Sequence, residues 1–372
     1  MQYVTAATAV HQHQLQSSSC AWILVPAHRI DSNKYRLNPK VALVIDDRMK
    51  NINDIKSKLG FLVCTSCRGG SLNLNQEGLQ CSACGTVFNI VRQIPRFVRN
   101  DDYAESFGFQ WNVHARTQLD SFTNKSISRD RLFGATGWPS DLSGQTVLEA
   151  GSGAGRFTEV LATTGASIIS FDLSSAVDAN HQSNGQHENL LIIQASILDI
   201  PVRPLSIDKV MCLGVIQHTP DPAHTFSCLA NCVRPGGELA IDVYAARLRS
   251  LLSWKYLLRP VTKRMDNRKL YKLIERITPA LVPVSEFLAR MLGRFGPRLL
   301  PIVHYPALGL SPELAYQWAV LDTFDMYSPA HDHPQSIATV KNWFDAVGFI
   351  DVTVGYGSNG IVARGRRPPA HP

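Results

Sequence analysis

This chain is built around the stretch Thr146-Val147-Leu148-Glu149-Ala150-Gly151-Ser152-Gly153-Ala154-Gly155-Arg156-Phe157. Its first four residues have the character of a strand, and three glycines follow at alternate positions. An apolar i, i+3, i+4 pattern then predicts a helix, which Gly165 ends. A strand, a glycine loop and a helix in this order bring backbone N–H groups close to a nucleotide-like ligand, because glycine lacks the Cβ that would keep the backbone away.

The glycine spacing and a nearby acid distinguish two classes of ligand. A dinucleotide loop reads G-x-G-x-x-G, whereas here Arg156 occupies the place of the last glycine. Glu149 stands two residues before the first glycine, where its carboxylate would repel a pyrophosphate and attract an ammonium. S-adenosylmethionine carries an amino-acid ammonium and a sulfonium but no phosphate. The sequence therefore favours this cofactor over a dinucleotide.

The composition is that of a globular chain with an excess of positive charge. Of 372 residues, 45% are hydrophobic and 18% are charged, which leaves room for a full domain, a small domain and an insert. The net charge of +7 suits an acidic partner such as nucleic acid, anionic lipid or a phosphorylated glycan. No apolar run reaches the roughly 18 residues that span a bilayer, and the N-terminus does not resemble a signal peptide. We expect a cytoplasmic location, with a peripheral position at the inner membrane face left open.

The N-terminal part of the chain divides into two regions. Residues 1–55 form a poorly defined extension, and whether residues 1–48 are native or a dispensable addition stays open. Residues 56–99 contain two C-x-x-C pairs, Cys64 with Cys67 and Cys81 with Cys84. Two such pairs place four thiolates around a tetrahedral Zn²⁺, and a site closed by four protein ligands is structural. We expect chelation to unfold this small module while the rest of the chain keeps its ligand.

Residues 100–145 are expected to form a helical linker rich in aromatic side chains. One interpretation is a connector that packs on the sheet domain. The other is a lid over the cofactor, formed by Tyr103, Phe107, Gln110 or Trp111.

Alternating strands and helices continue from the glycine loop to residue 244. The second strand ends in Asp172, 21 residues beyond Gly151, where a carboxylate can accept both ribose hydroxyls. The alternative is that Asp172 caps the helix after Ser174. The third strand leads to Ser196 and Ile197, and the fourth passes Gly214 and ends before the segment Gln217-His218-Thr219-Pro220.

These motifs, in this order and spacing, resemble the class I methyltransferases that use S-adenosylmethionine, in particular the small-molecule and polysaccharide-cluster enzymes of the type 11 group. The resemblance covers residues 100–244 and resumes at 311–367. It implies a Rossmann-like seven-stranded α/β sheet formed by residues 146–244 and 311–367. The cofactor-binding positions that it implies are Glu149, Gly151, Gly153, Gly155, Asp172, Ser196, Ile197 and Gly214. Residues 56–99 resemble the zinc ribbon that accompanies several methyltransferases.

Two positions depart from the family patterns. Ser196 stands where the methyltransferases usually have an Asp that contacts the adenine amino group, so we expect a weaker hydrogen bond there. In the ribbon, Arg92-Gln93 replaces the usual Asp-Gly, which changes a turn and not a metal ligand.

His218 is the candidate catalytic residue, because it follows the fourth strand at the edge where ligands bind in this architecture. An imidazole there can deprotonate an acceptor hydroxyl near neutral pH. The alternative is that its ring only orients the loop by bonding to a backbone carbonyl.

A basic insert, residues 245–310, interrupts the predicted fold. Between Arg247 and Gly309 there are thirteen Lys or Arg residues and three acids, a net charge of +10. Leucines and Trp254 are interleaved with these charges. Basic amphipathic helices of this kind suit an anionic membrane surface, RNA phosphates, or a solvated cap over the substrate.

We expect the acceptor to lie among His218, Tyr244 and the loop 322–333, and to be a small molecule, a glycan or a lipid-linked compound methylated on oxygen. His331 and His333, which flank Asp332, are expected to make local hydrogen bonds and not to bind metal. The rival function is ribosomal or transfer RNA methylation, with the ribbon binding RNA. A remote alternative is a non-catalytic zinc-ribbon scaffold, which the intact glycine loop and Asp172 disfavour.

Overall fold

A computed structural model describes residues 55–98, 104–246 and 253–370, apart from the side chain of Arg294. The expectations for residues 1–54, and for Tyr103, lie outside the described residues.

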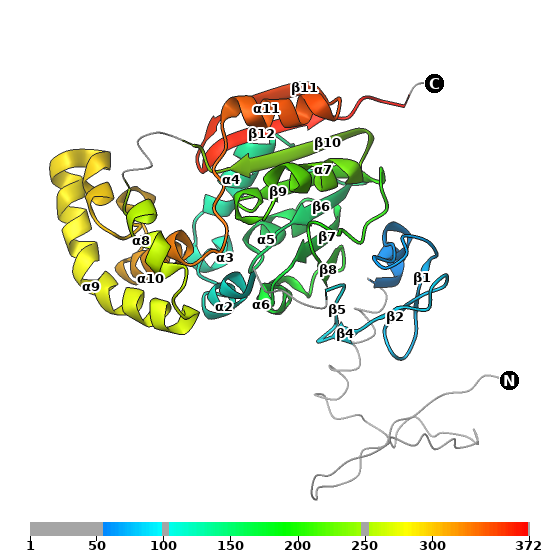
Figure 1. Cartoon of the computed structure of the whole chain (residues 1–372), viewed down its shortest axis with the longest axis horizontal. Helices are drawn as coiled ribbons and strands as arrows, with labels where there is room; N and C mark the ends of the chain where they lie inside the picture. The colour runs from blue at the N-terminus through cyan, green and yellow to red at the C-terminus, as the bar shows by residue number, and fades with distance from the viewer. Residues whose placement is uncertain (1–54, 99–103, 247–252, 371–372) are drawn as a thin grey trace, which may run out of the picture. The chain divides into compact units, whose positions relative to one another are not determined.

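The central element is a seven-stranded sheet, and the predicted α/β architecture is confirmed (Figure 1). The strand order is β11-β12-β10-β9-β6-β7-β8. The five strands from β10 to β8 are parallel, while β12 is antiparallel to both β10 and β11. The strands span Thr146–Ala150 (β6), Ser167–Asp172 (β7), Leu190–Gln194 (β8), Ile207–Leu213 (β9), Val233–Val243 (β10), Ile350–Gly357 (β11) and Gly360–Arg366 (β12). The chain winds outward from β6 to β8 and then returns to β9, so the strand order reverses beside β6, which is where ligands bind in open α/β sheets.

Helices cover the two faces of the sheet. One face packs on α4 (Ile127–Thr136), α5 (Arg156–Ala162) and α6 (Ala176–Asn184). The opposite face packs on α7 (Pro222–Cys232) and α11 (Ile337–Ala346). Successive strand residues alternate between the two cores, as Val147 and Leu148 do, because side chains on a strand point to opposite faces.

The cysteine-rich region packs on the same face of the sheet as α7 and α11. It consists of β1 (Leu72–Leu74), β2 (Leu79–Cys81), β3 (Val87–Phe88), β4 (Ile90–Val91) and β5 (Ile94–Pro95). Its buried residues Leu62, Leu79 and Phe97 belong to the same hydrophobic core as Phe171 and Ile193 of the sheet. In Figure 1 this ribbon lies beside β8.

The ribbon takes the place of a crossover helix. All residues between β8 and β9, 195–206, are described, and they contain no helix. Parallel strands need a crossover that returns over the sheet, and it usually carries a helix that buries the face. Here the crossover bonds instead to the ribbon: Val63 N donates to Pro201 O at 3.0 Å, and Arg203 N donates to Phe61 O at 2.7 Å. The ribbon and the sheet share one core, which argues against the expectation that the ribbon unfolds separately.

The basic insert is helical, as predicted, with α8 (Trp254–Thr262) and α9 (Asn267–Leu292). Both pack on α10 (Pro312–Tyr327), and α9 curves along the outer edge of this group in Figure 1. Pro279 and Pro283 lie inside α9, and proline bends a helix because it removes a backbone hydrogen bond. Two more helices, α2 (Glu105–Val113) and α3 (Asp120–Thr123), lead into the sheet domain.

Candidate active site

A cavity of about 600 Å³ lies where β6, β7, β9 and β10 end. Its wall includes residues from these strand ends, from α2, from α10 and from the insert. Six of the predicted site residues line it: Gly151, Gly153, Asp172, Ile197, Gly214 and His218. Glu149, Gly155 and Ser196 do not.

The glycine loop forms the cavity wall next to β6. Gly151 and Gly153 have φ values of 77° and 52°, in the left-handed region that favours glycine. A Cβ at Gly151 would lie 2.3 Å from Val215 Cγ2, and one at Gly153 would lie 3.1 Å from Trp111 Nε1. Both positions therefore need glycine, for conformation and for space.

Asp172 links the glycine loop to the end of β7. Its Oδ2 accepts a hydrogen bond from Gly153 N at 2.9 Å, and its Oδ1 accepts from Ser174 N at 2.9 Å and Ser174 Oγ at 2.7 Å. Asp172 therefore bonds to Ser174 at the start of the next segment, as the capping interpretation expects. It also lines the cavity, as the cofactor-binding interpretation expects. Its ribose-binding role stays a proposal.

Glu149 lies beneath the loop instead of in the cavity. It is 1% exposed, and its Oε2 accepts from Thr158 Oγ1 at 2.5 Å and Ser170 Oγ at 2.8 Å. Burial raises the pKa of this carboxyl to about 7. The expected direct attraction of the cofactor ammonium by Glu149 therefore needs correction: the side chain points into the core under α5, because alternate residues of β6 face opposite sides.

Gly155 and Ser196 make local contacts. A Cβ at Gly155 would lie 2.2 Å from Asn180 Oδ1, so this glycine allows α5 to approach α6. Ser196 Oγ accepts a hydrogen bond from Leu198 N at 3.2 Å. The expected adenine contact through Ser196 is not supported by its position, whereas its neighbour Ile197 lines the cavity.

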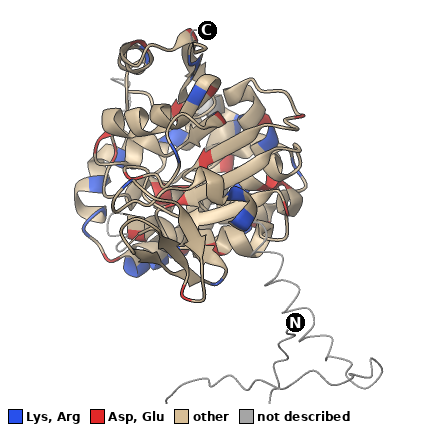
Figure 2. Cartoon of the chain, turned by 90° about the vertical axis from the view of Figure 1, so that its right-hand side faces the viewer, with Lys and Arg blue, Asp and Glu red and all other residues tan. Residues whose placement is uncertain are grey.

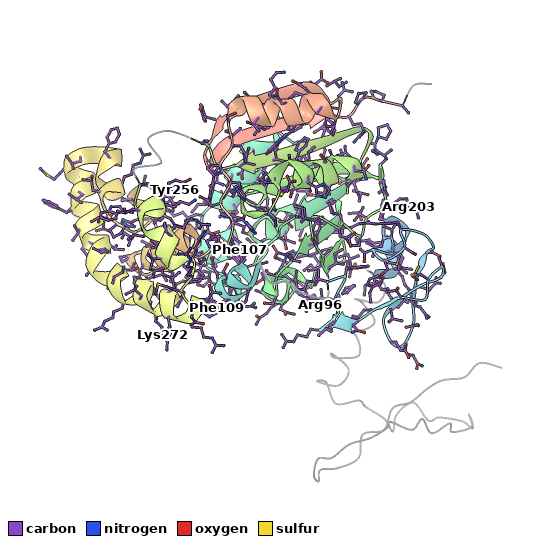
Figure 3. All side chains as sticks on the ribbon, viewed as in Figure 1. Arg96, Phe107, Phe109, Arg203, Tyr256 and Lys272 are labelled. Carbon is purple, nitrogen blue, oxygen red and sulfur yellow. The ribbon has the colours of Figure 1, made fainter. Side chains whose placement is uncertain are left out.

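Helix α2 covers the cavity with Phe107, Gln110 and Trp111, and Figure 3 shows Phe107 between the sheet and the helices of the insert. Gln110 is 1% exposed, and neither atom of its amide has a hydrogen-bond partner among the described residues. A buried amide without partners is costly, so a ligand that both donates and accepts fits here. This favours the lid interpretation of residues 100–145.

His218 lies in the short turn Ile216–His218 after β9. Its Nδ1 is 3.0 Å from the carbonyl oxygen of His331, which can only accept, so Nδ1 carries the proton and Nε2 carries the lone pair. Nε2 is buried and has no partner among the described residues. Burial lowers the pKa of His218, so the ring is neutral at neutral pH. The carbonyl contact and the base role are therefore compatible, because each uses a different nitrogen.

Helix α10 brings two carboxylates to the cavity, Asp322 and Asp325. The sequence pattern indicates an acceptor segment that begins at Asp322, but it does not identify either acid as a site residue. The signal in the sequence is a pair of acids three residues apart among apolar residues, since Val320, Leu321 and Phe324 are buried. Arg131 and Arg156 also line this part of the cavity and had no signal in the sequence.

The predicted loop 322–333 is partly helical, because Asp322 to Tyr327 belong to α10 and only the residues after Tyr327 form a loop. The rings of His331 and His333 stack with centroids 5.7 Å apart, and Asp332 pairs with Lys255 at 2.7 Å. Among the described residues, the four cysteines are the one cluster of ligands compatible with a metal.

The Sγ atoms of Cys64, Cys67, Cys81 and Cys84 all lie within 4.8 Å of one another. The Cys64–Cys84 and Cys67–Cys81 pairs are each 3.6 Å apart. Sulfurs bound tetrahedrally at about 2.3 Å from zinc are separated by about 3.8 Å. This donor set therefore fits a structural zinc ion.

Comparison with known proteins identifies the family to which the sheet domain is similar. Residues 148–241 match the model of a methyltransferase domain. The chain carries a class I methyltransferase domain. Together with the seven-stranded sheet, this confirms the predicted resemblance to the S-adenosylmethionine-dependent enzymes.

The curated relatives of this methyltransferase domain include ubiquinone biosynthesis O-methyltransferases. That of Xylella fastidiosa is 29% identical over 129 residues, which cover 33% of this chain and 52% of the relative. That of Acinetobacter baumannii is 30% identical over 132 residues, which cover 33% and 55%. The chain thus spans about half the length of these relatives.

Among solved structures, a putative methyltransferase of Methanococcus maripaludis has 15% identity and a TM-score of 0.39, covering 74% of this chain and 97% of that one. A Haloferax volcanii complex of a putative methyltransferase with the Trm112 activator has 13% identity and a TM-score of 0.40, covering 71% and 98%. At these scores neither likeness adds to the assignment.

Proposed function

We propose that this chain transfers a methyl group from S-adenosylmethionine to an oxygen atom of a small-molecule, glycan or lipid-linked acceptor. The proposal rests on the position of His218. Its Nε2 is buried without a partner among the described residues, and the residue lines the same cavity as the glycine loop. The curated relatives are O-methyltransferases by name, which supports oxygen as the methylated atom.

The cavity residues fit the cofactor. Ser152 Oγ is buried without a partner among the described residues, and Ser152 lines the cavity as part of the glycine loop. Gly151, Gly153, Asp172 and Ile197 would hold the cofactor, with Asp172 at the ribose. When bound, S-adenosylmethionine supplies an electrophilic methyl group on a sulfonium.

His218 acts on the acceptor. The acceptor hydroxyl gives its proton to Nε2, while Nδ1–H stays bonded to the His331 carbonyl and fixes the ring. Phe107 and Tyr244 pack against the same ring, at 5.2 and 5.3 Å between centroids, and exclude water from it. Positioning of the acceptor oxygen supplies much of the remaining acceleration.

The test follows transfer of a radiolabelled methyl group into an extract of the source organism, fractionated into lipid, RNA, protein and small solutes. We expect label in lipid, glycan or small solutes, and loss of it by about 100-fold or more in His218→Asn. Asn can keep the bond to the His331 carbonyl while it removes Nε2, and His224→Asn, an exposed histidine on α7, is the matched control. Label found only in RNA would establish the rival function instead.

The four cysteines are proposed to hold a structural Zn²⁺, since their sulfur spacing fits a tetrahedral site. No open coordination position is expected, so the metal takes no part in methyl transfer.

The insert is proposed to dock on an anionic membrane surface. No helix among the described residues is long and apolar enough to cross a bilayer. Exposed apolar residues nevertheless follow α9 at helical spacing and continue beyond it: Val284, Phe287, Met291 and Phe295. A second set, Trp254, Leu257 and Val261, follows α8.

Trp254 Nε1 donates to Leu299 O at 2.9 Å, which joins the start of α8 to the segment that follows α9. Exposed basic residues accompany the two apolar sets, among them Arg290, Arg298 and Lys272, and Lys272 projects outward from α9 (Figure 3). On the side of the molecule seen in Figure 2, by contrast, basic and acidic residues are interspersed. Phosphates of RNA would need the basic residues alone, whereas a membrane uses both the charges and the exposed apolar side chains.

Cosedimentation with vesicles of equal parts phosphatidylcholine and phosphatidylglycerol tests this docking. We expect binding that weakens with salt and is lost in Phe287→Ser/Met291→Ser, with vesicles of phosphatidylcholine alone as the control. Undiminished vesicle binding by the double variant, or binding of RNA in place of vesicles, would contradict it.

A further inference from the structure

The acceptor end of the cavity is rich in hydrogen-bonding side chains. Asp322 and Asp325, one turn apart on α10, both line it. Gln118 Nε2 donates to Asp322 Oδ1 at 3.2 Å, and Tyr244 OH donates to Asp325 Oδ2 at 3.2 Å. The Tyr305 hydroxyl also bonds to Asp322. These contacts hold both carboxylates in place with their oxygens near the cavity.

The charged side chains that line the cavity limit the charge of the acceptor. Three cations and three carboxylates are present: Arg131, Arg156 and Lys255, with Asp172, Asp322 and Asp325. Arg131 is already paired with Asp242 at 2.8 Å, and Lys255 with Asp332 at 2.7 Å. Because those two partners lie outside the cavity, Arg156 is left with three carboxylates in the lining, and the cavity therefore disfavours an anionic acceptor.

Asp322 can both donate and accept hydrogen bonds at this end of the cavity. Burial, and secondarily the nearby Asp325, raise the pKa of Asp322 to about 7, against the opposing effect of Arg156. At neutral pH this carboxyl is therefore present in both forms, and it can donate to one hydroxyl group and accept from another.

The number of polar groups separates two neutral classes of acceptor. A phenolic ring offers one or two hydroxyls and would engage few of the polar groups at this end, which would leave part of the Gln110 amide unpaired at about 1–3 kcal/mol. Gln110 alone presents a donor and an acceptor without partners among the described residues. A saturated ring that carries several hydroxyls can satisfy these groups together, while Tyr305 and Trp318 offer aromatic surfaces to its C–H faces.

We propose that Gln110, Asp322 and Asp325 form the acceptor subsite, and that they bind the hydroxyls of a neutral, polyhydroxylated ring of the sugar class. This inference rests on the proposed methyl transfer and specifies its substrate. The three residues are binding residues, and His218 remains the group that takes the proton.

The experiment identifies the labelled product. The full-length protein is incubated with extract and methyl-labelled S-adenosylmethionine, the product is hydrolysed, and the label is chromatographed against mono-O-methyl sugars, methylated phenols and methylated nucleosides. Label in a methyl sugar supports the subsite. Label in a phenol, a nucleoside or an amine overturns it while leaving methyl transfer intact.

Variants then connect the product to the residues. Asp325→Asn and Gln110→Leu should raise the KM for the isolated acceptor about tenfold or more, with calorimetric affinity for S-adenosylmethionine unchanged in Asp325→Asn. Glu313→Gln, an exposed carboxylate of the same helix, is the matched control. An unchanged KM in Asp325→Asn would refute the subsite. Absence of transferred label in every fraction would contradict the proposed function itself, and the inference with it.

Discussion

Asp172 connects the glycine loop to the cavity through a bond of 2.9 Å from Gly153 N to its carboxylate. The same carboxylate fixes Ser174 at the start of the next segment. One side chain thus sets the shape of the loop and presents charge to the cavity. Substitution at this position is expected to affect the ligand more than the fold.

Asp172→Ala should weaken binding of S-adenosylmethionine by about 1.5–3 kcal/mol, because a charged acceptor is lost. Isothermal calorimetry measures the affinity directly. Asp345→Ala, at a carboxylate exposed on α11, is the control. Equal affinities of Asp172→Ala and the unmodified protein would remove Asp172 from the cofactor site.

Glu149→Gln should flatten the dependence of stability on pH. The folded pKa of about 7 lies above the ordinary value of 4.5, so between these values the folded protein holds a proton that the unfolded chain releases. The free energy of unfolding therefore falls as pH rises through this window. Denaturant titrations at about pH 5 and about pH 8 should show a larger loss for the unmodified protein than for Glu149→Gln. The same loss in both proteins would show that Glu149 is ionised in the fold.

At the scale of elements, the ribbon is attached to the sheet by side chains as well as by its apolar core. Arg96 follows β5 and donates to Gln194 Oε1 of β8 at 2.9 Å and to Asp178 of α6 at 2.6 Å. Its side chain is 12% exposed. Arg92 lies 3.6 Å from the same Asp178 but is 76% exposed. Figure 3 shows Arg96 at the junction of the ribbon and the sheet.

This difference predicts unequal effects of two arginine substitutions. Arg96→Ala should lower the free energy of unfolding by about 1.5–3 kcal/mol, since it leaves the buried side of Asp178 and Gln194 without a partner. Arg92→Ala is the matched control and should change it by less than about 1 kcal/mol. Chemical denaturation of both variants decides the matter, and equal effects would mean that the contact of Arg96 does not hold the two elements together.

At the scale of the whole molecule, the ribbon and the methyltransferase sheet form one cooperative unit. The crossover between β8 and β9 has no helix, and ribbon residues such as Leu62 and Phe97 cover that part of the sheet. Loss of the ribbon would expose apolar side chains of β7 and β8 to water, which disfavours the folded sheet.

Chelation, or Cys81→Ser, is therefore expected to lower the midpoint of a single thermal transition and to abolish binding of S-adenosylmethionine at the same time. Calorimetric scans with and without the ligand measure both effects. Cys228→Ser, at a half-buried cysteine outside the metal cluster, is the control. Retained ligand binding after the ribbon has unfolded would show that the two parts are independent.

Local features were predictable because their causes are local. Three closely spaced glycines, an acid at the end of a strand and two C-x-x-C pairs each need only neighbouring residues to form a loop, a strand end or a metal knuckle. The methyltransferase fold and the cysteine cluster were therefore accessible from the sequence. The face on which Glu149 lies was also implicit in the alternation of β6, although the glycine motif directed attention to the cofactor instead.

The meeting of distant segments, by contrast, depends on long-range packing. Gln110, His218, Tyr244 and Asp322 come from four parts of the chain and line one cavity, and no periodicity within a segment records such convergence. The packing of the ribbon at the β8–β9 crossover also depends on long-range contacts. An apolar sheet face must be covered, but its sequence does not show which segment of the chain covers it. Local sequence patterns account for the strands of the methyltransferase sheet, the glycine loop and the cysteine cluster. Long-range packing determined the acceptor end of the site and made the metal module part of the core.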